Sequence, residues 1–484
     1  MNDTTNSLTT RIIFGKNRNP QSQFYYRDLS KPVFDLDRET YEFLQDAAPE
    51  MMEKTHGEAG SLLPYFPGYQ FENGKSVYRG EEVGEGGRVF AMPGMYGNVA
   101  LLDIASMHPH SAIMEVLFGV EFTRKFKEIV DGRVNIKHEA WEAVNQMLDG
   151  KLTKYIQKVL DGELVSADLA NALKIAINSV YGLTAANFEN PFRDLRNKDN
   201  IVAKRGALFM VDLQKEVEKR GFVVAHIKTD SIKIPDATPE IIQFVMDFGK
   251  RYGYTFEHEA TYEKMCLVND AVYIAKYKDG THAGEWTATG TQFAVPYVFK
   301  KLFNKEEILF EDLCETKSVS SALYLDMNEG LPDVSEYEKE LSKLESKYKK
   351  GELSDTTFEK RGQELSALIE KGHNYIFVGK VGNFCPMKSG CGGGILLREK
   401  DGKYYAAAGS KGYRWLESEM VKELGKEADI DKQYYISMAD EAAAAIAKHG
   451  DFEWFVSDDP YVKDDKVPGF MEIPEDADEE IPFF

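Results

Sequence analysis

Residues 98–114, NVALLDIASMHPHSAIM, decide which fold the chain is expected to adopt. The apolar run at 99–102 predicts a buried strand that carries Asp103 to its C-terminal end. The chain then turns at Ser106, and Pro109 is well placed as the first residue of a helix. A carboxylate at a strand end beside a helix N-terminus can hold a cation and a phosphate together. The alternative is that Asp103 only caps the helix.

A second stretch, SADLANALKIAINSVYG at 166–182, has the spacing of an amphipathic helix. Lys174, Asn178 and Tyr181 share one helix face, because their spacing is i, i+4, i+7. We expect the serine that opens the stretch to cap the helix and the glycine that closes it to follow the helix end. The apolar residues of another face should pack inward: Leu169, Leu173, Ala176 and Val180. The polar face could carry a triphosphate and a base, and the alternative is an ordinary helix with a solvated lysine.

A third stretch, FVVAHIKTDSIKI at 222–234, predicts two strands that meet at Thr229 and Asp230. The tip of this hairpin then carries a second carboxylate, that of Asp230. The alternative is an ordinary polar turn.

In this order, the three stretches resemble the polymerase core of family B DNA polymerases. DIASMHP at 103–109 is similar to the family's first catalytic motif, DFxSLYP, and KTDS at 228–231 is similar to the third, DTDS. KIAINSVYG at 174–182 matches the second motif, KxxxNSxYG, at every fixed position. Similar flanking segments extend the resemblance to about residues 78–300, and it is nearest to the phage polymerases.

The resemblance implies an α+β fold with the right-hand architecture of these enzymes, in which a palm of antiparallel sheet plus helices is joined by fingers and a thumb. The expected segments are an N-terminal scaffold region (1–97), the first part of the palm (98–115), the fingers (116–175), the second part of the palm (176–290), the thumb and C-terminal region (291–455) and an acidic tail (456–484).

Nucleotidyl transfer uses two divalent cations about 3.5–4 Å apart, and Mg²⁺ prefers carboxylate ligands. By the resemblance, Asp103, Asp230 and the backbone carbonyl of Ile104 bind two Mg²⁺ ions, which Mn²⁺ could replace. Lys174 completes the expected catalytic residues by neutralising charge on the triphosphate. Lys228 stands where the family has an additional aspartate, but the family's metal ligand is the later aspartate of that motif.

The resemblance also assigns nucleotide-binding residues. Lys174 faces the triphosphate, whereas Asn178 and Tyr181 line the nascent base pair. Ser106 and His108 are expected at the nucleotide as well, with His108 in the place of the family's sugar-discriminating tyrosine. A further phosphate-binding cation should lie on the preceding fingers helix, and Lys154 and Lys158 are the candidates.

For the DNA itself, Tyr273 and Lys276 are candidates for holding the primer strand near its end. The linking segment NPFRDLRNKDNIVAKRG at 190–206 carries cations that could contact backbone phosphates. The alternative for these cations is solvated surface charge. They are Arg193, Arg196, Lys204 and Arg205.

Composition limits the setting of the protein. Of 484 residues, 43% are hydrophobic and 12% aromatic, which is typical of a folded enzyme, and no apolar run is long enough to span a membrane. Four scattered cysteines and no signal peptide indicate a reducing cytoplasm, the host cytoplasm for a phage protein. Because the net charge is −21, DNA would have to bind a local basic surface on an acidic body.

Three further segments complete the expectations. FDLDRE at 34–39 invites comparison with an exonuclease motif, but Asp37 stands where glutamate is expected and too little chain precedes the polymerase motif. We therefore expect no exonuclease domain, and proofreading by a separate polypeptide. Residues 335–371 predict a helical hairpin, and 435–455 a final helix.

The last residues, EDADEEIPFF, resemble the tail of bacterial single-stranded-DNA-binding proteins and imply docking of replication partners. The alternative is an acidic tail that keeps the chain soluble or shields its DNA cleft. Taken whole, the sequence predicts a template-directed DNA polymerase that extends a primer with deoxynucleoside triphosphates, in phage replication. The alternatives are a gap-filling or lesion-bypass polymerase, and a catalytically inactive polymerase-like subunit that binds DNA.

Overall fold

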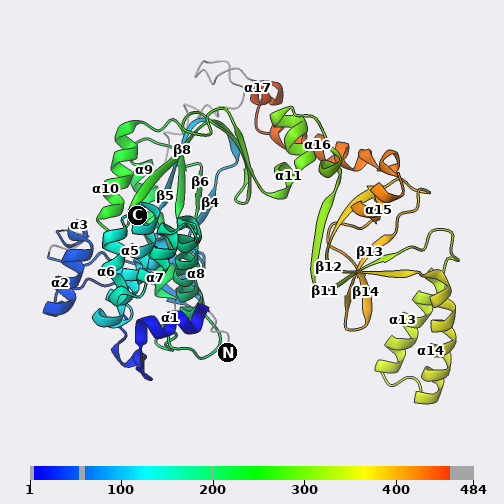
Figure 1. The fold of residues 1–484 in the computed structure, drawn as a ribbon, viewed down its shortest axis with the longest axis horizontal. Coiled ribbons are helices and arrows are strands. Elements are labelled where there is room, and N and C mark those ends of the chain that lie inside the picture. The colour runs from blue at the N-terminus through cyan, green and yellow to red at the C-terminus, as the bar shows by residue number, and fades with distance from the viewer. Residues whose placement is uncertain (1–4, 54–59, 198–199, 458–484) are drawn as a thin grey trace, which may run out of the picture. The chain divides into compact units, whose positions relative to one another are not determined.

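The computed structural model describes residues 5–53, 60–197 and 200–457, and it divides between Thr287 and Ala288 into two compact units (Figure 1). Helices and antiparallel sheets occupy separate segments of each unit, which agrees with the expected α+β class. The finer division into scaffold, palm, fingers and thumb stays a prediction. No helix within the described ranges is long and apolar enough to cross a bilayer.

The first unit is built on a seven-stranded sheet with the order β10-β9-β8-β5-β7-β6-β4. The long strand β5 pairs antiparallel with β7 on one side and β8 on the other. The strands are β4 (Val89–Ala91), β5 (Gly94–Ile104), β6 (His226–Lys228), β7 (Ser231–Ile234), β8 (Phe256–Asn269), β9 (Val272–Tyr277) and β10 (Trp286–Thr289). A separate three-stranded sheet precedes it in the chain: β1 (Gln70–Glu72), β2 (Lys75–Tyr78) and β3 (Glu81–Val83).

The helices of the first unit fall into three groups along the chain. N-terminal to the sheets lie α1 (Thr5–Phe14), η1 (Pro20–Gln23), α2 (Arg38–Ala47) and α3 (Pro49–Met52). Between β5 and β6 lie α4 (Met107–Met114), α5 (Gly119–Lys137), α6 (Trp141–Gln146), η2 (Met147–Gly150), α7 (Thr153–Leu160), α8 (Ser166–Thr184) and α9 (Ile201–Glu218). Between β7 and β8 lies α10 (Pro239–Lys250).

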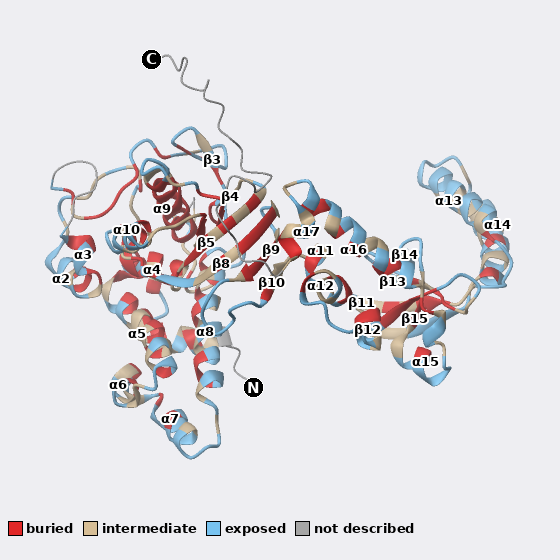
Figure 2. Ribbon diagram, turned by 90° about the horizontal axis from the view of Figure 1, so that it is seen from above, coloured by how far each residue is buried: buried red, intermediate tan, exposed pale blue. Residues whose placement is uncertain are grey.

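The two faces of the seven-stranded sheet differ in what covers them. Successive side chains of a strand point to opposite faces, so Leu102 and Ile232 face the main core together with buried residues of α4, α9 and α10. Figure 2 shows α4 and α9 against one side of the sheet, with α9 buried along most of its length. Leu101 and Tyr262 belong to a separate, smaller apolar cluster. Asp103 follows Leu101 by two residues and therefore lies on that second face.

Residues 78–88 are joined to α9 by polar contacts, which we call the polar seam. The Tyr78 hydroxyl donates to the Asp212 carboxylate at 2.9 Å, and Nε of Arg79 donates to the same group at 2.6 Å. The Lys204 ammonium pairs with Glu85 at 2.9 Å. These polar bonds add to apolar packing, because Tyr78 and Val83 belong to the main core together with buried residues of α9.

Three expected helix boundaries are wrong. The helix after Asp103 begins at Met107, so Pro109 is its third residue; proline is tolerated there because the first-turn N–H groups have no intrahelical partner. Ser166 is the first residue of α8 and caps nothing, since Val165 occupies the N-cap position. The helix also continues through Gly182 to Thr184, where packing outweighs the weak helix preference of glycine.

The second unit contains a five-stranded sheet of order β14-β13-β11-β12-β15. Its strands are β11 (Glu315–Asp326), β12 (Tyr375–Met387), β13 (Ile395–Lys400), β14 (Lys403–Ala406) and β15 (Arg414–Glu417). The predicted helical hairpin is confirmed as α13 (Ser335–Lys349) and α14 (Asp355–Ile369). The single helix expected at 435–455 is wrong, because α16 (Lys432–Ala447) and α17 (Phe452–Val456) are separate helices. The other short helices are α11 (Thr291–Ala294), α12 (Pro296–Phe299), η3 (Lys300–Asn304), η4 (Phe310–Leu313), η5 (Glu370–Gly372), α15 (Ser418–Glu423) and η6 (Glu427–Asp429).

Candidate active site

Strand β5 positions the first predicted carboxylate. The predicted buried strand is confirmed, since Val99 and Leu102 are fully buried. Asp103 lies near its end, opposite Ser231 on β7 and Glu257 on β8. Hydrogen bonds to strands on both sides therefore fix the backbone that carries this carboxylate.

The second carboxylate, Asp230, lies at the tip of the β6–β7 hairpin, as predicted. Thr229 adopts a φ of +55°, and its amide donates to the carbonyl of Arg88 at 2.8 Å. Gly87 permits this approach, because a Cβ there would lie 3.0 Å from Cγ2 of Thr229. The Ile104 amide donates to the Asp230 carbonyl at 2.9 Å. That bond ties the turn of Asp230 to the end of β5, and so brings the two predicted carboxylates to one place.

These two carboxylates are short of positive charge. Burial, followed by repulsion from Asp230, raises the pKa of Asp103 to about 7, and Glu257 and Glu259 add to the effect. Burial likewise raises the pKa of Asp230 above its ordinary value, although His108 opposes the shift. Half-buried carboxylates with elevated pKa values are typical of functional sites. A bound cation would favour their ionised forms.

Asp103 and Asp230 fit a magnesium site in which waters and substrate phosphates supply the remaining ligands. The described part of the chain contains no group of three or more His, Cys, Asp or Glu side chains that could hold a metal ion. Mg²⁺, however, is commonly held by one or two carboxylates with waters and substrate phosphates. Asp103 and Asp230 supply such a pair, and Ile104 lies directly after Asp103 on the same strand.

His108 and Tyr181 form a stacked pair beside the carboxylates. Their ring centroids are 4.1 Å apart and their planes are inclined by 5°. Burial lowers the pKa of His108 below its ordinary value, although Asp230 acts in the opposite direction, so the imidazole is neutral near pH 7. The stack brings the C-terminal part of α8 against α4. It therefore joins two predicted nucleotide-binding residues that are far apart in the sequence.

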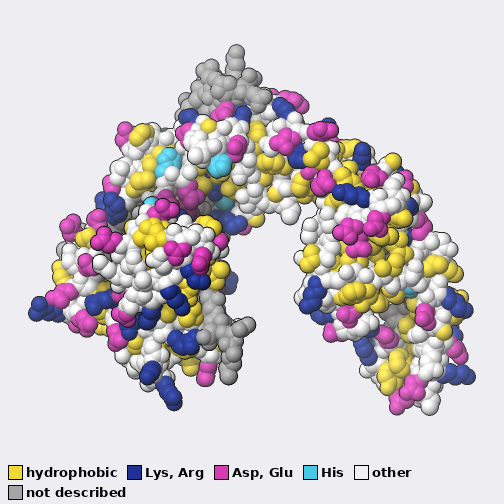
Figure 3. Space-filling model, viewed as in Figure 1, with side chains coloured by type: hydrophobic (Ala, Val, Ile, Leu, Met, Phe, Trp, Pro, Cys, Tyr) yellow, Lys and Arg dark blue, Asp and Glu magenta, His cyan; other side chains and the backbone are white. Residues whose placement is uncertain are grey.

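A basic cavity of about 370 Å³ lies between α5 and α8, and we call it the α5–α8 cavity. Its wall includes Lys174 and Asn171 from α8 and Arg133 and Lys137 from α5. Nη1 of Arg133 also donates to the hydroxyl of Ser106 at 3.4 Å. Figure 3 shows Lys and Arg side chains gathered over helices α5, α7 and α8 on the face drawn. This is a local basic surface of the kind expected on the acidic chain.

The expectation that Lys154 or Lys158 supplies the second phosphate-binding cation stays a prediction. Arg133 and Lys137, which line the α5–α8 cavity with Lys174, were missed in the sequence. Lys154 and Lys158 lie on α7 instead, where the ammonium of Lys154 packs 4.7 Å from the Tyr155 ring centroid and Lys158 pairs with Glu163 at 3.9 Å. The i, i+4 spacing of Arg133 and Lys137 shows that they share one face of a helix, but not which helix that face meets.

Two of the four predicted DNA-binding residues, Lys204 and Lys276, are buried. Lys204 is fully buried in the polar seam, where it also donates to the carbonyl of Gly84 at 3.0 Å. Lys276 on β9 is 7% exposed, and its ammonium lies 5.8 Å from the Trp286 ring centroid. The contact of either ammonium with DNA stays a prediction. Helix α9 is buried on nearly every side, which a pattern of single charges does not reveal.

The remaining candidates differ in their availability. Arg196 is exposed, but it makes two bonds to Asp194, at 2.9 and 2.6 Å, so much of its charge is already neutralised. Arg205 is buried, and its Nε pairs with Glu115 at 2.8 Å. Tyr273 is half-buried on β9, and its role at the primer stays a prediction. Arg193 lies in a different pocket, on the loop after α8.

A buried lysine–histidine pair lies on the same face as Asp103 and was also missed. Nζ of Lys233 donates to Nδ1 of His226 at 3.1 Å, and Nε2 of His226 lies 3.1 Å from the carbonyl of Asp270. Burial lowers the pKa of Lys233 to about 8 and that of His226 to about 4. The alternation of the IKI sequence at 232–234 was the signal, because it turns the lysine away from the main core.

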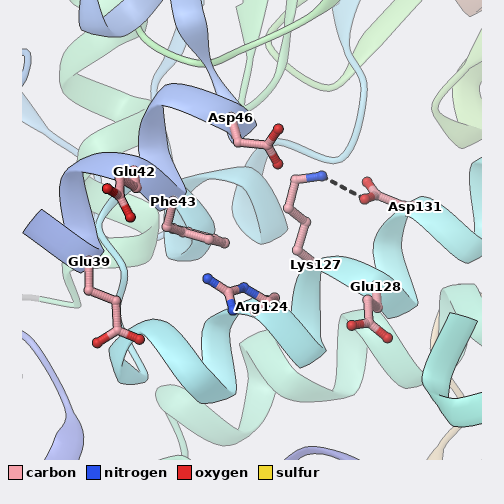
Figure 4. Close-up of a pocket in the computed structure, with 8 residues that line it drawn as sticks. All are labelled: Glu39, Glu42, Phe43, Asp46, Arg124, Lys127, Glu128 and Asp131. Carbon is pink, nitrogen blue, oxygen red and sulfur yellow. Dashed lines mark hydrogen bonds and ion pairs between the residues drawn. The ribbon is translucent and has the colours of Figure 1, made fainter.

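A second cavity, of about 410 Å³, separates α2 from α5 and contains none of the predicted site residues. Figure 4 shows its five carboxylates around Arg124 and Lys127, with Lys127 paired to Asp131 at 2.6 Å. Asp37, from the segment compared with an exonuclease motif, caps α2 by accepting from the amide of Thr40 at 2.9 Å. That carboxylate therefore has a structural role. The predicted docking peptide at 475–484 lies outside the described residues.

Comparisons with known proteins add little to this geometry. No protein-family model matches the chain, and no curated protein matches it. Among solved structures, it is similar to the family B DNA polymerase from the hyperthermophilic archaeon Pyrobaculum calidifontis, with 15% sequence identity and a TM-score of 0.39. The alignment covers 76% of this chain and 49% of that one, so the chain spans about half the length of that polymerase. A likeness this distant supports no functional conclusion.

Proposed function

We propose that the chain is a template-directed DNA polymerase that extends a primer with deoxynucleoside triphosphates by two-metal nucleotidyl transfer. The observation that carries the proposal is the meeting of Asp103 and Asp230 at the ends of paired strands, with Lys174 in a basic cavity on the neighbouring helices. Three separate motifs of the sequence supply these residues. A carboxylate pair beside a cationic cavity is the charge pattern that a metal-bound triphosphate requires.

The side chains suggest how the nucleotide would lie. Lys174, Arg133 and Lys137 would hold the triphosphate in the α5–α8 cavity and stabilise charge that develops there. The ring of His108, fixed by Tyr181, would lie under the sugar. Asn178 is exposed on α8 between Lys174 and Tyr181, where it can meet the base.

Asp103 and Asp230, with the carbonyl of Ile104, would hold two Mg²⁺ ions, for which Mn²⁺ could substitute. Bound there, the ions would lower the pKa of the primer hydroxyl and neutralise charge on the phosphates. The seven-stranded sheet with α4, α9 and α10 would form the palm, α5–α8 the fingers, and the second unit the thumb and C-terminal region. A separate exonuclease and other replication partners, docked through the tail, and a phage setting in the host cytoplasm rest on motif resemblance alone.

Primer extension tests the proposal directly. Purified chain is mixed with a labelled primer on a longer template, four deoxynucleotides and Mg²⁺, and parallel reactions contain EDTA or omit one nucleotide. We expect metal-dependent extension that stops where the template calls for the omitted nucleotide. Binding of primer–template without extension would instead identify an inactive DNA-binding subunit, and extension only across short gaps a gap-filling polymerase. If the folded chain neither binds nor extends DNA, the proposal is wrong.

A further inference from the structure

A pocket of about 590 Å³ lies where the loop after α1 meets the loop after α8, and we call it the loop pocket. The first loop contributes Arg18 and Gln21, and the second contributes Asn187, Phe188 and Arg193. None of the residues assigned above to metal or nucleotide lines it. Its chemistry therefore has to be explained separately.

The walls of the loop pocket are held by specific bonds. Nε2 of Gln21 donates to the carbonyls of Asn190 at 3.2 Å and Pro191 at 3.0 Å, which joins the two loops. Nδ2 of Asn190 donates to the carbonyl of Leu183 in the last turn of α8. Phe192 is buried, with its ring centroid 4.8 Å from that of Phe14 on α1. The second loop is thus anchored at both α8 and α1.

Several groups in this anchored pocket are left without partners. The guanidinium groups of Arg18 and Arg193 make no hydrogen bond or ion pair with a side chain of the described residues, in contrast to Arg196 with its two bonds to Asp194. Phe188 is 61% exposed and Leu195 is 82% exposed, although both are large and apolar. Glu189 is the acidic residue among the lining residues. Exposed aromatic faces beside free cations are the elements with which proteins bind single-stranded nucleic acid, by stacking on bases and pairing with phosphates.

The position of the pocket along α8 indicates which strand would enter it. Lys174 lines the phosphate cavity, and Tyr181 lies about two turns further along the helix, roughly 10 Å at 1.5 Å per residue. The loop pocket begins after Leu183, beyond the position of the base. In template-directed synthesis, the nucleic acid that lies beyond the nascent base pair is the unpaired template.

We propose that the loop pocket binds the single-stranded template one nucleotide ahead of the templating base. Phe188 stacks on that unpaired base, and Arg18 and Arg193 contact the flanking phosphates. The inference rests on the proposed polymerase function and identifies the part of its site that takes single-stranded DNA.

The test compares one primer on two templates, whose single-stranded extensions are one and ten nucleotides long. Phe188→Ala and the double variant Arg18→Ala/Arg193→Ala are measured beside the controls Phe34→Ala and Arg38→Ala, which alter an exposed phenylalanine and an exposed arginine elsewhere in the first unit. We expect both pocket variants to lose about five- to tenfold in affinity and extension on the long template and nothing on the short one. Unchanged thermal unfolding would show that the variants are folded.

Binding of a fluorescent ten-nucleotide single strand separates this inference from the polymerase proposal. Each phosphate that a protein neutralises on a single strand contributes about 0.7 to the slope of log K against log salt, so the double-arginine variant should show a slope smaller by about 1.4. If wild type binds this strand through the loop pocket but extends no primer, the pocket stands and the polymerase proposal fails. Equal losses on both templates, or none on either together with unchanged strand binding, would overturn the inference.

Discussion

Two places in the first unit bury acidic charge, and they treat it in opposite ways. Glu115, directly after α4, is buried between Arg27, whose Nε and Nη2 donate to it at 2.5 and 2.8 Å, and Arg205, at 2.8 Å. Burial alone would raise the pKa of Glu115, but the two guanidinium groups hold it below its ordinary value. Asp103, one helix away in the chain, has no such partners, and its pKa rises to about 7.

The difference separates structural charge from charge kept for a ligand. Around Glu115 the chain provides the counter-ions itself, and the network connects the N-terminal segment, α4 and α9. Around Asp103 the chain supplies only the partial influence of Lys233, which does not prevent the rise of the Asp103 pKa, so an external cation can complete the balance. Substitutions at these acids and at the groups around them can test the contrast, and the most damaging changes are considered first.

Removing the charge of Asp103 or Asp230 should abolish polymerase activity without weakening the fold. Asp103→Asn or Asp230→Asn should lower the rate of primer extension about 10⁴-fold, roughly 5 kcal/mol of transition-state stabilisation. Stability in EDTA should be no lower than wild type, because a repulsive charge has been removed. Single-turnover extension and urea unfolding are the measurements, with the exposed Asp247→Asn as control. Extension within tenfold of wild type by a folded variant would contradict the mechanism.

Removing the charge of Glu115 should instead weaken the fold. Glu115→Gln leaves two buried guanidinium groups without their counter-charge, and we expect the free energy of unfolding to fall by about 3–5 kcal/mol. Glu42→Gln, which breaks an exposed pair with Arg38, should cost less than about 1 kcal/mol. Urea unfolding at pH 7 measures both. A loss at Glu115 no larger than at Glu42 would mean that the network has no special structural role.

The cations of the α5–α8 cavity should matter to the nucleotide and not to the fold. Lys174→Ala and Arg133→Ala should each weaken deoxynucleotide affinity about 10- to 100-fold, or about 1.4–2.7 kcal/mol, with little change in primer–template binding. Lys125→Ala on α5, a lysine paired with Glu121, is the matched control. The measurement is the rate of single-turnover incorporation as a function of nucleotide concentration. An unchanged curve for Lys174→Ala would mean that Lys174 is a solvated surface lysine with no role in nucleotide binding.

The two acids should also give opposite pH dependences. The pKa of Asp103 is raised on folding, so its contribution to stability is present below about pH 4 and is lost as the pH rises toward 7, whereas that of Glu115 is lost as the pH falls. The free energy of unfolding of Asp103→Asn, relative to that of wild type, should therefore increase from pH 5 to pH 8. After allowance for solvent screening, we expect an increase of about 1–2 kcal/mol. Urea unfolding across this range in EDTA is the measurement, and Mg²⁺ should reduce the difference. A pH-independent difference would contradict the assignment.

His108 represents a third way to bury an ionisable group, which is to keep it neutral. Stacked aromatic pairs such as His108 and Tyr181 contribute about 0.5–1.5 kcal/mol. The imidazole ring is smaller than the ring of the tyrosine that the motif resemblance would place at this position. His108→Ala should raise the ratio of ribonucleotide to deoxynucleotide incorporation about three- to tenfold. The exposed His258→Ala serves as control. If the ratio is unchanged, another side chain excludes the ribose hydroxyl.

The sequence was most informative where the signal is local. Asp103, Asp230 and the face of α8 follow from short strands, a two-residue turn and helical spacing. Arg133 and Lys137 required the register between two helices separated by about thirty residues of other structure, which spacing alone does not provide. The burial of Lys204 and Lys276 could not be foreseen, because the charge of a single lysine in the sequence does not show whether the fold buries it. Helix ends at Pro109 and Gly182 were set by packing that outweighs local preference.

The polar seam between residues 78–88 and α9 affects how the chain could be divided into two separately made pieces. A core holds its segments by apolar area, whereas this seam joins them through pairs such as Lys204 with Glu85 and Tyr78 with Asp212. The segment before β5 also shares the main core with α9, through buried residues such as Phe66 and Val83. Two separately made pieces would therefore have both polar and apolar contacts with which to reassociate. Split-protein complementation, with the two pieces made separately and mixed, is better suited to this segment than deletion, which would leave Lys204 and Asp212 inside without these partners.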